Sequence, residues 1–172
     1  MRQSSTVDSR FSITSCYDIT MSSKVKVDVG SASLLQALAE FRYQLRSFLQ
    51  FSERAANEHD VRPQQHQLLL QIAGIQDGHA ATINYLAGRL GLRQNSVVEL
   101  ADRSEAENLV RRTEDPEDRR RVVLCVTAKG MRLLDRLADS HARELDELAP
   151  PLIRALDRIK TARAASAKGR QR

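Results

Sequence analysis

The chain has 172 residues, enough for one domain with a substantial core, and its 41% hydrophobic but only 4% aromatic residues favour a mainly helical protein. It lacks an apolar run long enough for a membrane span or a signal peptide, and two distant Cys residues give no disulfide framework, so we expect a cytoplasmic protein. The net charge of +5 does not by itself indicate nucleic-acid binding, because residues 31–153 carry sixteen basic and eighteen acidic residues and the C-terminal residues supply the excess.

Residues 1–30 are rich in Ser and Thr and show no sustained hydrophobic period, which predicts a disordered N-terminal arm. Met21 would be a plausible alternative start. Cys16 lies in this arm, and the nearest preceding basic residue is Arg10, so little in its sequence surroundings would lower its pKa. We therefore interpret Cys16 as an inert thiol, with a thiol-based sensor as the alternative.

The residues from 31 to 163 form one predicted domain that opens with a long helix from Ser33 to Glu58. Ser33 suits the N-cap, and apolar residues recur every three or four positions. Pro63 suits the first turn of a second helix, and Asp77-Gly78 makes a turn into a third.

Two further helices with a tight turn between them follow. The first runs from Thr82, its expected cap, to Leu90 and ends at Gly91, which tolerates the left-handed conformation. The second runs from about Gln94 to Glu107, and Asn108 releases the chain. This arrangement indicates a helix-turn-helix.

A predicted β-hairpin comes next. The runs LVRRTE and RRVVLCVT flank DPED, where Asp115 and Pro116 favour a type I turn. Five arginines gather on the hairpin, and helix-turn-helix followed by a two-stranded ribbon is the order of a DNA-reading winged helix-turn-helix. The phase of the second strand predicts that Cys125 faces away from the local core.

A second long helix is expected from Thr127 to about Leu148, with Leu134, Leu137 and His141 on a seam typical of a packed helix pair. Pro150-Pro151 should end it, and a shorter helix should follow. We expect residues 164–172 to be a basic disordered tail.

The quoted motifs resemble those of the MarR family of bacterial transcription regulators. The wing sequence from Asp115 to Gly130 is the most specific part, and Leu86–Leu92 and Ser96–Arg103 resemble the family's two-helix motif. Three positions depart from the usual pattern. Ser104 replaces a leucine, Glu107 replaces a basic or neutral residue, and Asn108 replaces a glycine.

The resemblance implies a mainly α fold with a small β-hairpin wing (α+β), in which residues 33–60 and 127–163 form dimerisation helices around a winged helix-turn-helix at 63–126. It further implies a homodimeric repressor that binds double-stranded DNA at an inverted-repeat operator and is released by a small-molecule effector bound between the dimerisation helices and the reading unit.

Candidate DNA-binding residues follow from these assignments. On the second helix of the motif we expect base or phosphate contacts from six side chains: Arg93, Gln94, Asn95, Ser96, Glu99 and Arg103. Asn95 and Ser96 are also the residues of this set most suited to cap the helix. On the wing we expect contacts from Arg119, Arg120 and Arg121, and the resemblance assigns the minor-groove contact to Arg120, with Asp118 supporting it.

Other classes of function have weaker support in the sequence. The sequence has no HExxH, CxxC or glycine-rich phosphate loop, and the spacing of His59 and His66 matches no strong metal-ligand motif, so we expect no catalytic residues, no metal and no cofactor. Two alternatives stay open. One is a redox-sensing regulator that uses Cys16 or Cys125, and the other is a protein-binding family member whose DNA affinity is weakened by Ser104 and Glu107.

Overall fold

The structure, a computed structural model, describes residues 29–76, 79–115, 118 and 120–169, with the backbone alone for 29–31 and 165–169. The elements in chain order are α1 (Val29–Glu58), α2 (Pro63–Ala73), α3 (Ile83–Leu90), α4 (Gln94–Ala106), β1 (Val110–Glu114), β2 (Val122–Val126) and α5 (Ala128–Gly169). The predicted fold class, mainly helical with one small hairpin, is confirmed. The expected disordered arm, with Cys16, lies outside the described residues, as does the turn at Asp77-Gly78.

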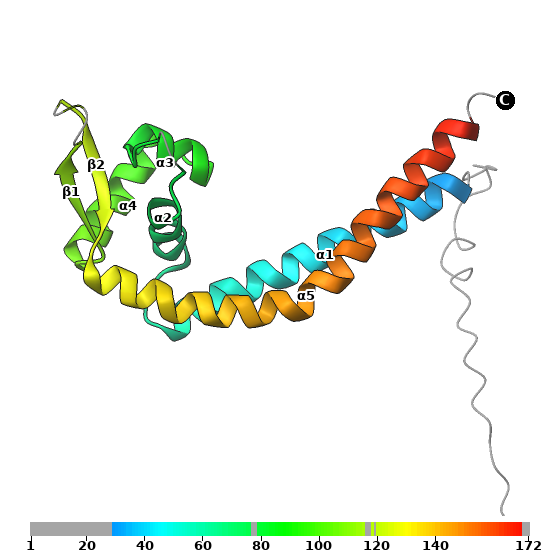
Figure 1. Ribbon diagram of the computed structural model, residues 1–172, viewed down its shortest axis with the longest axis horizontal. Coiled ribbons are helices and arrows are strands. Elements are labelled where there is room, and N and C mark those ends of the chain that lie inside the picture. The colour runs from blue at the N-terminus through cyan, green and yellow to red at the C-terminus, as the bar shows by residue number, and fades with distance from the viewer. Residues whose placement is uncertain (1–28, 77–78, 116–117, 119, 170–172) are drawn as a thin grey trace, which may run out of the picture.

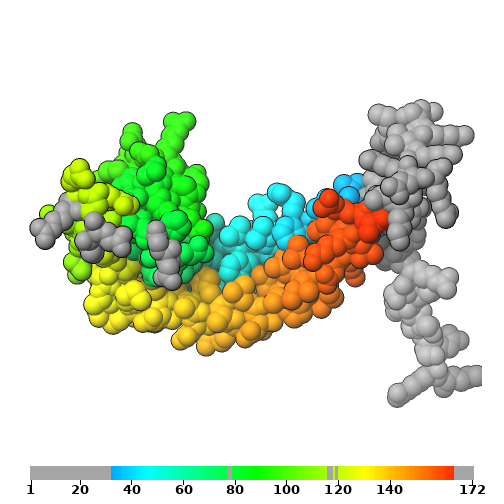
Figure 2. All heavy atoms as spheres, turned by 45° about the horizontal axis from the view of Figure 1, so that its top comes forward, coloured from blue at the N-terminus to red at the C-terminus, as the bar shows by residue number. Residues whose placement is uncertain are grey.

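The molecule has two parts (Figure 1). A head contains α2, α3, α4 and the hairpin of β1 and β2, and an arm consists of α1 and α5, which run antiparallel and pack along their lengths. In the space-filling view the arm is a narrow rod that extends from one side of the head (Figure 2). The head is therefore attached to one end of a long helix pair.

Local signals set the ends of the helices in the head. The Thr82 hydroxyl accepts a hydrogen bond from the backbone N–H of Tyr85 at 3.2 Å, so Thr82 caps α3 as predicted. Gly91 and Asn108 have φ values of 65° and 55°, the left-handed conformation expected of both. The cap position of α4 is Arg93, whose side chain makes no capping bond. The prediction that Asn95 and Ser96 cap this helix is therefore wrong.

The core of the head lies between the three short helices, the hairpin and the first turns of α5. Apolar side chains from each element are almost completely buried there, among them Leu68, Leu86, Val97, Val110, Leu124 and Leu137. The two strands pair antiparallel, and the backbone N–H of Leu124 also donates to the carbonyl of Ala81 at 3.0 Å. The hairpin is thus fixed to the segment that precedes α3.

The arm differs from its prediction at three places. The first helix begins at Val29, four residues before Ser33, so Ser33 is not its cap. The last helix continues through Pro150-Pro151, and it extends to Gly169, into the residues expected to be a disordered tail. Each proline removes one intrahelical donor, but Leu148, Ala155 and Ala162 are buried at seven-residue intervals along this helix. We attribute the continuity of α5 to this packing. The rule that proline ends a helix considers only neighbouring residues and therefore does not include it.

Candidate nucleic-acid interface

Helix α4, hereafter the reading helix, has one buried face and one exposed face. Val97, Leu100, Ala101 and Ser104 are buried, and every candidate contact residue on this helix and at its cap is exposed, namely Arg93, Gln94, Asn95, Ser96, Glu99 and Arg103. The structure therefore brings the predicted polar residues together on one solvent-facing surface. Whether they contact DNA remains a prediction.

Hydrogen bonds satisfy polar groups at both ends of the reading helix. Ser104, fully buried, donates its hydroxyl to the carbonyl of Leu100 at 2.8 Å, so the polar group that replaces the family's leucine is satisfied. At the other end Gln94 Nε2 donates to Asn84 Oδ1 of α3 at 2.8 Å. The exposed Glu107 occupies the C-cap position, and Lys129 donates its ammonium to the carbonyl of that residue at 2.8 Å.

The hairpin, hereafter the wing, presents Arg120 and Arg121 on its exposed surface. The backbone N–H of Arg120 donates to Asp118 Oδ1 at 3.1 Å, and Nε of Arg120 lies 3.4 Å from the same oxygen. Arg121 Nε lies 3.6 Å from Oδ2 of Asp115, a buried carboxylate. The expected proximity of Asp118 to Arg120 is confirmed, and Arg119 and Pro116 lie outside the described residues.

Sequence reasoning missed a bridge between the reading helix and the wing. Arg112 of β1 pairs with Asp102 at 2.5 Å and with Glu105, and its backbone N–H donates to Glu105 at 2.9 Å. The backbone N–H and then the guanidinium of Arg112 hold the pKa of Glu105 below its ordinary value. The helical spacing of Asp102 and Glu105 places both on one face. Their partner, however, depends on how the wing folds back, which the sequence pattern alone does not fix.

A histidine cluster, in which His66 is buried and His141 is half-buried, lies where the arm meets the head. The rings of His66 (α2) and His141 (α5) are centred 5.0 Å apart. His141 donates through Nδ1 to the carbonyl of Leu137 at 2.6 Å, because a carbonyl only accepts, and its Nε2 therefore accepts from the Ser52 hydroxyl at 2.8 Å in the neutral ring. Burial, followed by the charge of His141, lowers the pKa of His66 to about 4. The ring of His66 is consequently neutral near pH 7.

The arrangement of the described His and Cys side chains gives little support to a metal site or to a reactive thiol. Within the described ranges, no three His, Cys, Asp or Glu residues come close enough to hold a metal ion. His59 Nδ1 lies 2.9 Å from the carbonyl of Ala55 instead. Cys125 is half-buried and its sulfur lies 3.4 Å from the Thr113 hydroxyl. Leu124 belongs to the core of the head and Val126 packs against it, whereas Cys125 does neither, so the prediction that Cys125 faces away from the local core is confirmed.

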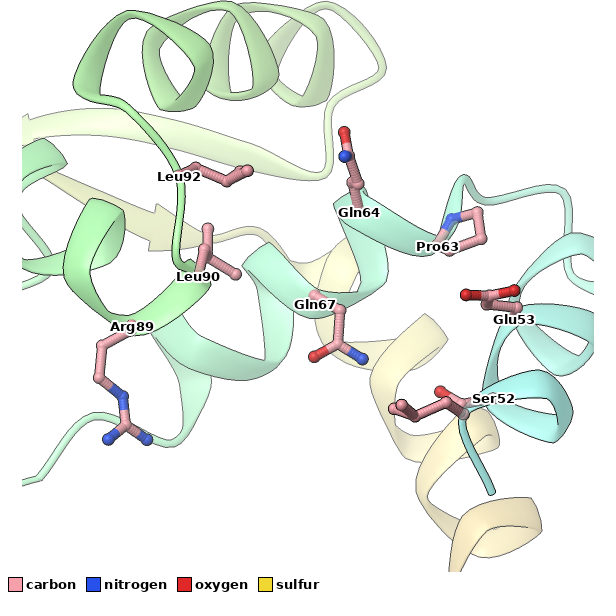
Figure 3. A pocket seen from close by; sticks show the side chains of 9 residues that line it. Ser52, Glu53, Pro63, Gln64, Gln67, Arg89, Leu90 and Leu92 are labelled. Atoms are coloured by element: carbon pink, nitrogen blue, oxygen red, sulfur yellow. The ribbon is translucent and has the colours of Figure 1, made fainter. Parts of the chain in front are cut away.

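A cavity of about 260 Å³ lies between the arm and the head (Figure 3). Ser52 and Glu53 of α1 line one side, Gln64 and Gln67 of α2 line another, and Leu90 and Leu92 come from the turn between α3 and α4; Leu49, Pro63 and Arg89 complete the lining. Ser52 thus belongs to both the cavity and the histidine cluster. No helix among the described residues is long and apolar enough to cross a membrane.

The exposed polar helix of a helix-turn-helix beside an arginine-bearing hairpin defines a winged helix-turn-helix DNA-binding protein. Residues 59–121, which contain the helix-turn-helix and the first strand of the wing, match the model of the MarR family. This segment is therefore similar to MarR family transcription regulators, and the resemblance seen in the sequence is confirmed over these residues.

Solved structures agree with the assignment of the fold. AbsC, a MarR family transcriptional regulator from Streptomyces coelicolor, is 20% identical over 83% of this chain and 97% of its own, with a TM-score of 0.58. The DNA complex of MepR from Staphylococcus aureus is 22% identical over 75% and 93%, with a TM-score of 0.55. CouR from Rhodococcus jostii RHA1, bound to p-coumaroyl-CoA, is 25% identical over 59% and 69%, with a TM-score of 0.52. No curated protein sequence matches the chain.

Proposed function

We propose that the protein is a homodimeric, cytoplasmic repressor that binds an inverted-repeat operator and leaves it when a small molecule occupies the cavity between arm and head. The observation that carries the DNA-binding part is the single exposed surface formed by the reading helix. Arg93 and Gln94 lie at its first turn, where side chains of such helices reach base edges in the major groove. Arg suits guanine, and Gln suits adenine.

The wing supplies the second contact of the proposed complex. Arg120 has 92% of its side chain exposed, and Asp118 restrains it at the tip of the hairpin. A guanidinium at such a tip suits the negative potential of a narrow minor groove. Arg121 lies nearby and adds positive charge for the phosphates. The Ser104 hydroxyl is satisfied by the carbonyl of Leu100 within the reading helix, so the departure from leucine leaves no unpaired polar group beneath it.

Exposed apolar side chains on the arm support dimerisation. Leu35, Leu38, Leu45 and Leu49 follow helical spacing on α1, and Leu145, Ile153 and Leu156 do so on α5, all between 38% and 59% exposed. The arm already buries other faces of both helices against each other. The exposed apolar side chains of α1 and α5 form a further apolar surface, and we expect a second copy of the chain to bury it. Two-fold symmetry would then place two reading helices in successive major grooves.

The cavity supports the effector part of the proposal by its position. It contacts α1, α2 and the turn that precedes the reading helix, so an occupant would touch both the arm and the DNA-reading unit. Its volume of about 260 Å³ favours a small molecule. CouR is a relative solved with a bound small molecule, p-coumaroyl-CoA, which supports an effector-responsive role without identifying the effector here.

The test of the proposed function combines sedimentation with gel shifts on the intergenic DNA upstream of the gene. We expect a dimer in free solution and a specific shift that unlabelled random DNA does not abolish. A cavity-filling variant, Gln67→Trp, should bind the same DNA but resist release by any molecule that releases the wild-type protein. A stable monomer that still protects a symmetric site would contradict the dimeric part, and absence of any specific shift would contradict operator binding.

A further inference from the structure

Asn84 is the residue of the helix-turn-helix that the proposed function leaves without a role. It occupies the second position of α3, and Gln94 occupies the first position of the reading helix. The Nε2 atom of Gln94 donates to Oδ1 of Asn84 at 2.8 Å, and both side chains are exposed. The two helices of the motif are therefore linked, near their N-terminal ends, by a hydrogen bond on the solvent-facing surface.

This hydrogen bond restricts the side chain of Gln94. A free glutamine loses rotamer freedom when it docks on a base, and a side chain already held in one orientation avoids part of that loss. One N–H of Gln94 is used by Asn84, which leaves the second N–H and the oxygen Oε1 unpaired by the described residues. Adenine recognition needs one donor and one acceptor from the same amide. The bonded Gln94 retains both.

The same hydrogen bond orients Asn84. Its oxygen accepts from Gln94, so its own amide N–H groups point away from that bond on an exposed surface. Neutral amide donors commonly contact phosphate oxygens in protein–DNA complexes, and such contacts set the register of the protein on the duplex. The side chain of Asn84 can therefore donate to the DNA backbone while its oxygen accepts from Gln94.

We propose that Asn84 is a specificity-determining residue, which positions Gln94 through its oxygen and donates its amide N–H to the DNA backbone. This inference rests on the proposed function, in which the reading helix enters the major groove. It assigns two separable roles to one side chain, and each role depends on a different atom of the amide.

Substitution by Asp separates the two roles. Asn84→Asp keeps an acceptor oxygen for Gln94 but removes the donor and adds a negative charge, whereas Asn84→Ala removes both atoms. We expect Asn84→Asp to retain the sequence preference at the base pair read by Gln94 while binding every duplex on the order of tenfold more weakly. We expect Asn84→Ala to relax preference at that base pair, within the roughly 5- to 150-fold range of a good amide–base contact.

The experiment is selection of bound duplexes from a randomised library with the full-length protein, followed by titration of the selected duplex and its single-base variants. The proteins are wild type, Gln94→Ala, Asn84→Ala, Asn84→Asp and the Gln94→Ala/Asn84→Ala double variant. Asn57→Ala, an exposed Asn on α1, is the matched control. Circular dichroism should show an unchanged fold in each. The double variant should show the same preference as Gln94→Ala at the base pair read by Gln94, because Asn84 acts there through Gln94.

The outcomes separate this inference from the proposed function. If Gln94→Ala changes the preference at one base pair and Asn84→Ala leaves it at the wild-type level, Asn84 does not position Gln94 and the inference fails alone. If Asn84→Asp binds all duplexes as tightly as wild type, the backbone donation is wrong. If Gln94→Ala itself leaves the preference unchanged, the reading face in the proposed function is wrong, and the inference falls with it.

Discussion

Arg120 lies at the tip of the wing with 92% of its side chain exposed, and its described contacts are with Asp118 alone. A side chain in this position contributes little to the core, since its charge is screened by water and the pair with Asp118 is a surface one. Its role is therefore best sought in the DNA complex. The restraint by Asp118 reduces the freedom that the guanidinium would lose on entering a groove.

Arg120→Ala should weaken DNA binding across all sequences and lower the slope of log affinity against log salt by about one, because one phosphate-region charge is lost. Fold and dimerisation should persist. Titration of operator and random DNA at several salt concentrations measures this, with Arg136→Ala, an exposed arginine of the arm, as the control. Unchanged affinity and slope on both DNAs would remove the wing from the DNA-binding site.

Single residues also show what local sequence signals convey. Thr82, Gly91 and Asn108 have the roles predicted for them, because a cap or a positive φ depends on a few neighbouring residues. The contacts of Asn84 and Ser104 do not follow from such local signals. The partner of Asn84 is Gln94, across the turn, and the hydroxyl of Ser104 is satisfied by the carbonyl one helical turn earlier.

At the scale of elements, the bridge from Arg112 to Asp102 and Glu105 joins the reading helix to the wing. The two carboxylates lie on the same helix face, so removing the guanidinium leaves two like charges together. The bridge is partly exposed, and solvent screening limits its contribution to stability. Its main effect is on the orientation of the wing relative to the reading helix.

Arg112→Met should lower the free energy of unfolding by roughly 1 kcal/mol and weaken operator binding, because the wing is no longer fixed to the reading helix. Urea unfolding and gel shifts measure the two effects. Arg111→Met is the control for stability, since Arg111 precedes Arg112 on the same strand and its side chain is exposed. Equal stability of the two variants would show that the bridge does not stabilise the head.

The histidine cluster gives the junction of head and arm a predicted pH dependence. The pKa of His66 is about 4 in the folded protein and near 6.5 when unfolded, so the unfolded state binds the proton more tightly between these values. The stabilisation is present above pH 6.5 and is lost as pH falls toward 4. By this shift alone, the loss would reach about 3 kcal/mol.

Urea unfolding between pH 4.5 and 7.5 should therefore show that the free energy of unfolding falls more steeply with decreasing pH for wild type than for His66→Leu. His79→Gln, at an exposed histidine of the head, should decline as the wild type does. Parallel curves for wild type and His66→Leu would show that His66 is not the group responsible.

The elements missed or misplaced by sequence reasoning depend on distant partners. The continuity of α5 through Pro150-Pro151 depends on packing against α1, and the bond between Ser52 and His141 joins residues 89 positions apart. Hydrophobic period and proline rules describe only a local stretch of chain, so neither feature was predictable from them. The winged helix-turn-helix was predictable because its turns, caps and hairpin are all local.

For the whole molecule, the exposed apolar stripes of the arm predict a dimer. Ile153→Glu places a charge on a side chain that is 57% exposed in the single chain and that the dimer should bury. We expect this variant to sediment as a monomer, or to dimerise at least roughly tenfold more weakly, since burying an unpaired charge is costly. Leu70→Glu, at an exposed leucine of the head, should remain dimeric. A fully dimeric Ile153→Glu protein would exclude this stripe from the interface.

The central claim is that two reading helices of a dimer recognise an inverted repeat. Selection of duplexes from a randomised library, followed by hydroxyl-radical footprinting of the enriched sequence, tests it most directly. We predict an inverted repeat with half-site centres about 10 base pairs apart and symmetric protection that Arg120→Ala weakens. Enrichment of no sequence, or of one asymmetric half-site protected by a monomer, would contradict it.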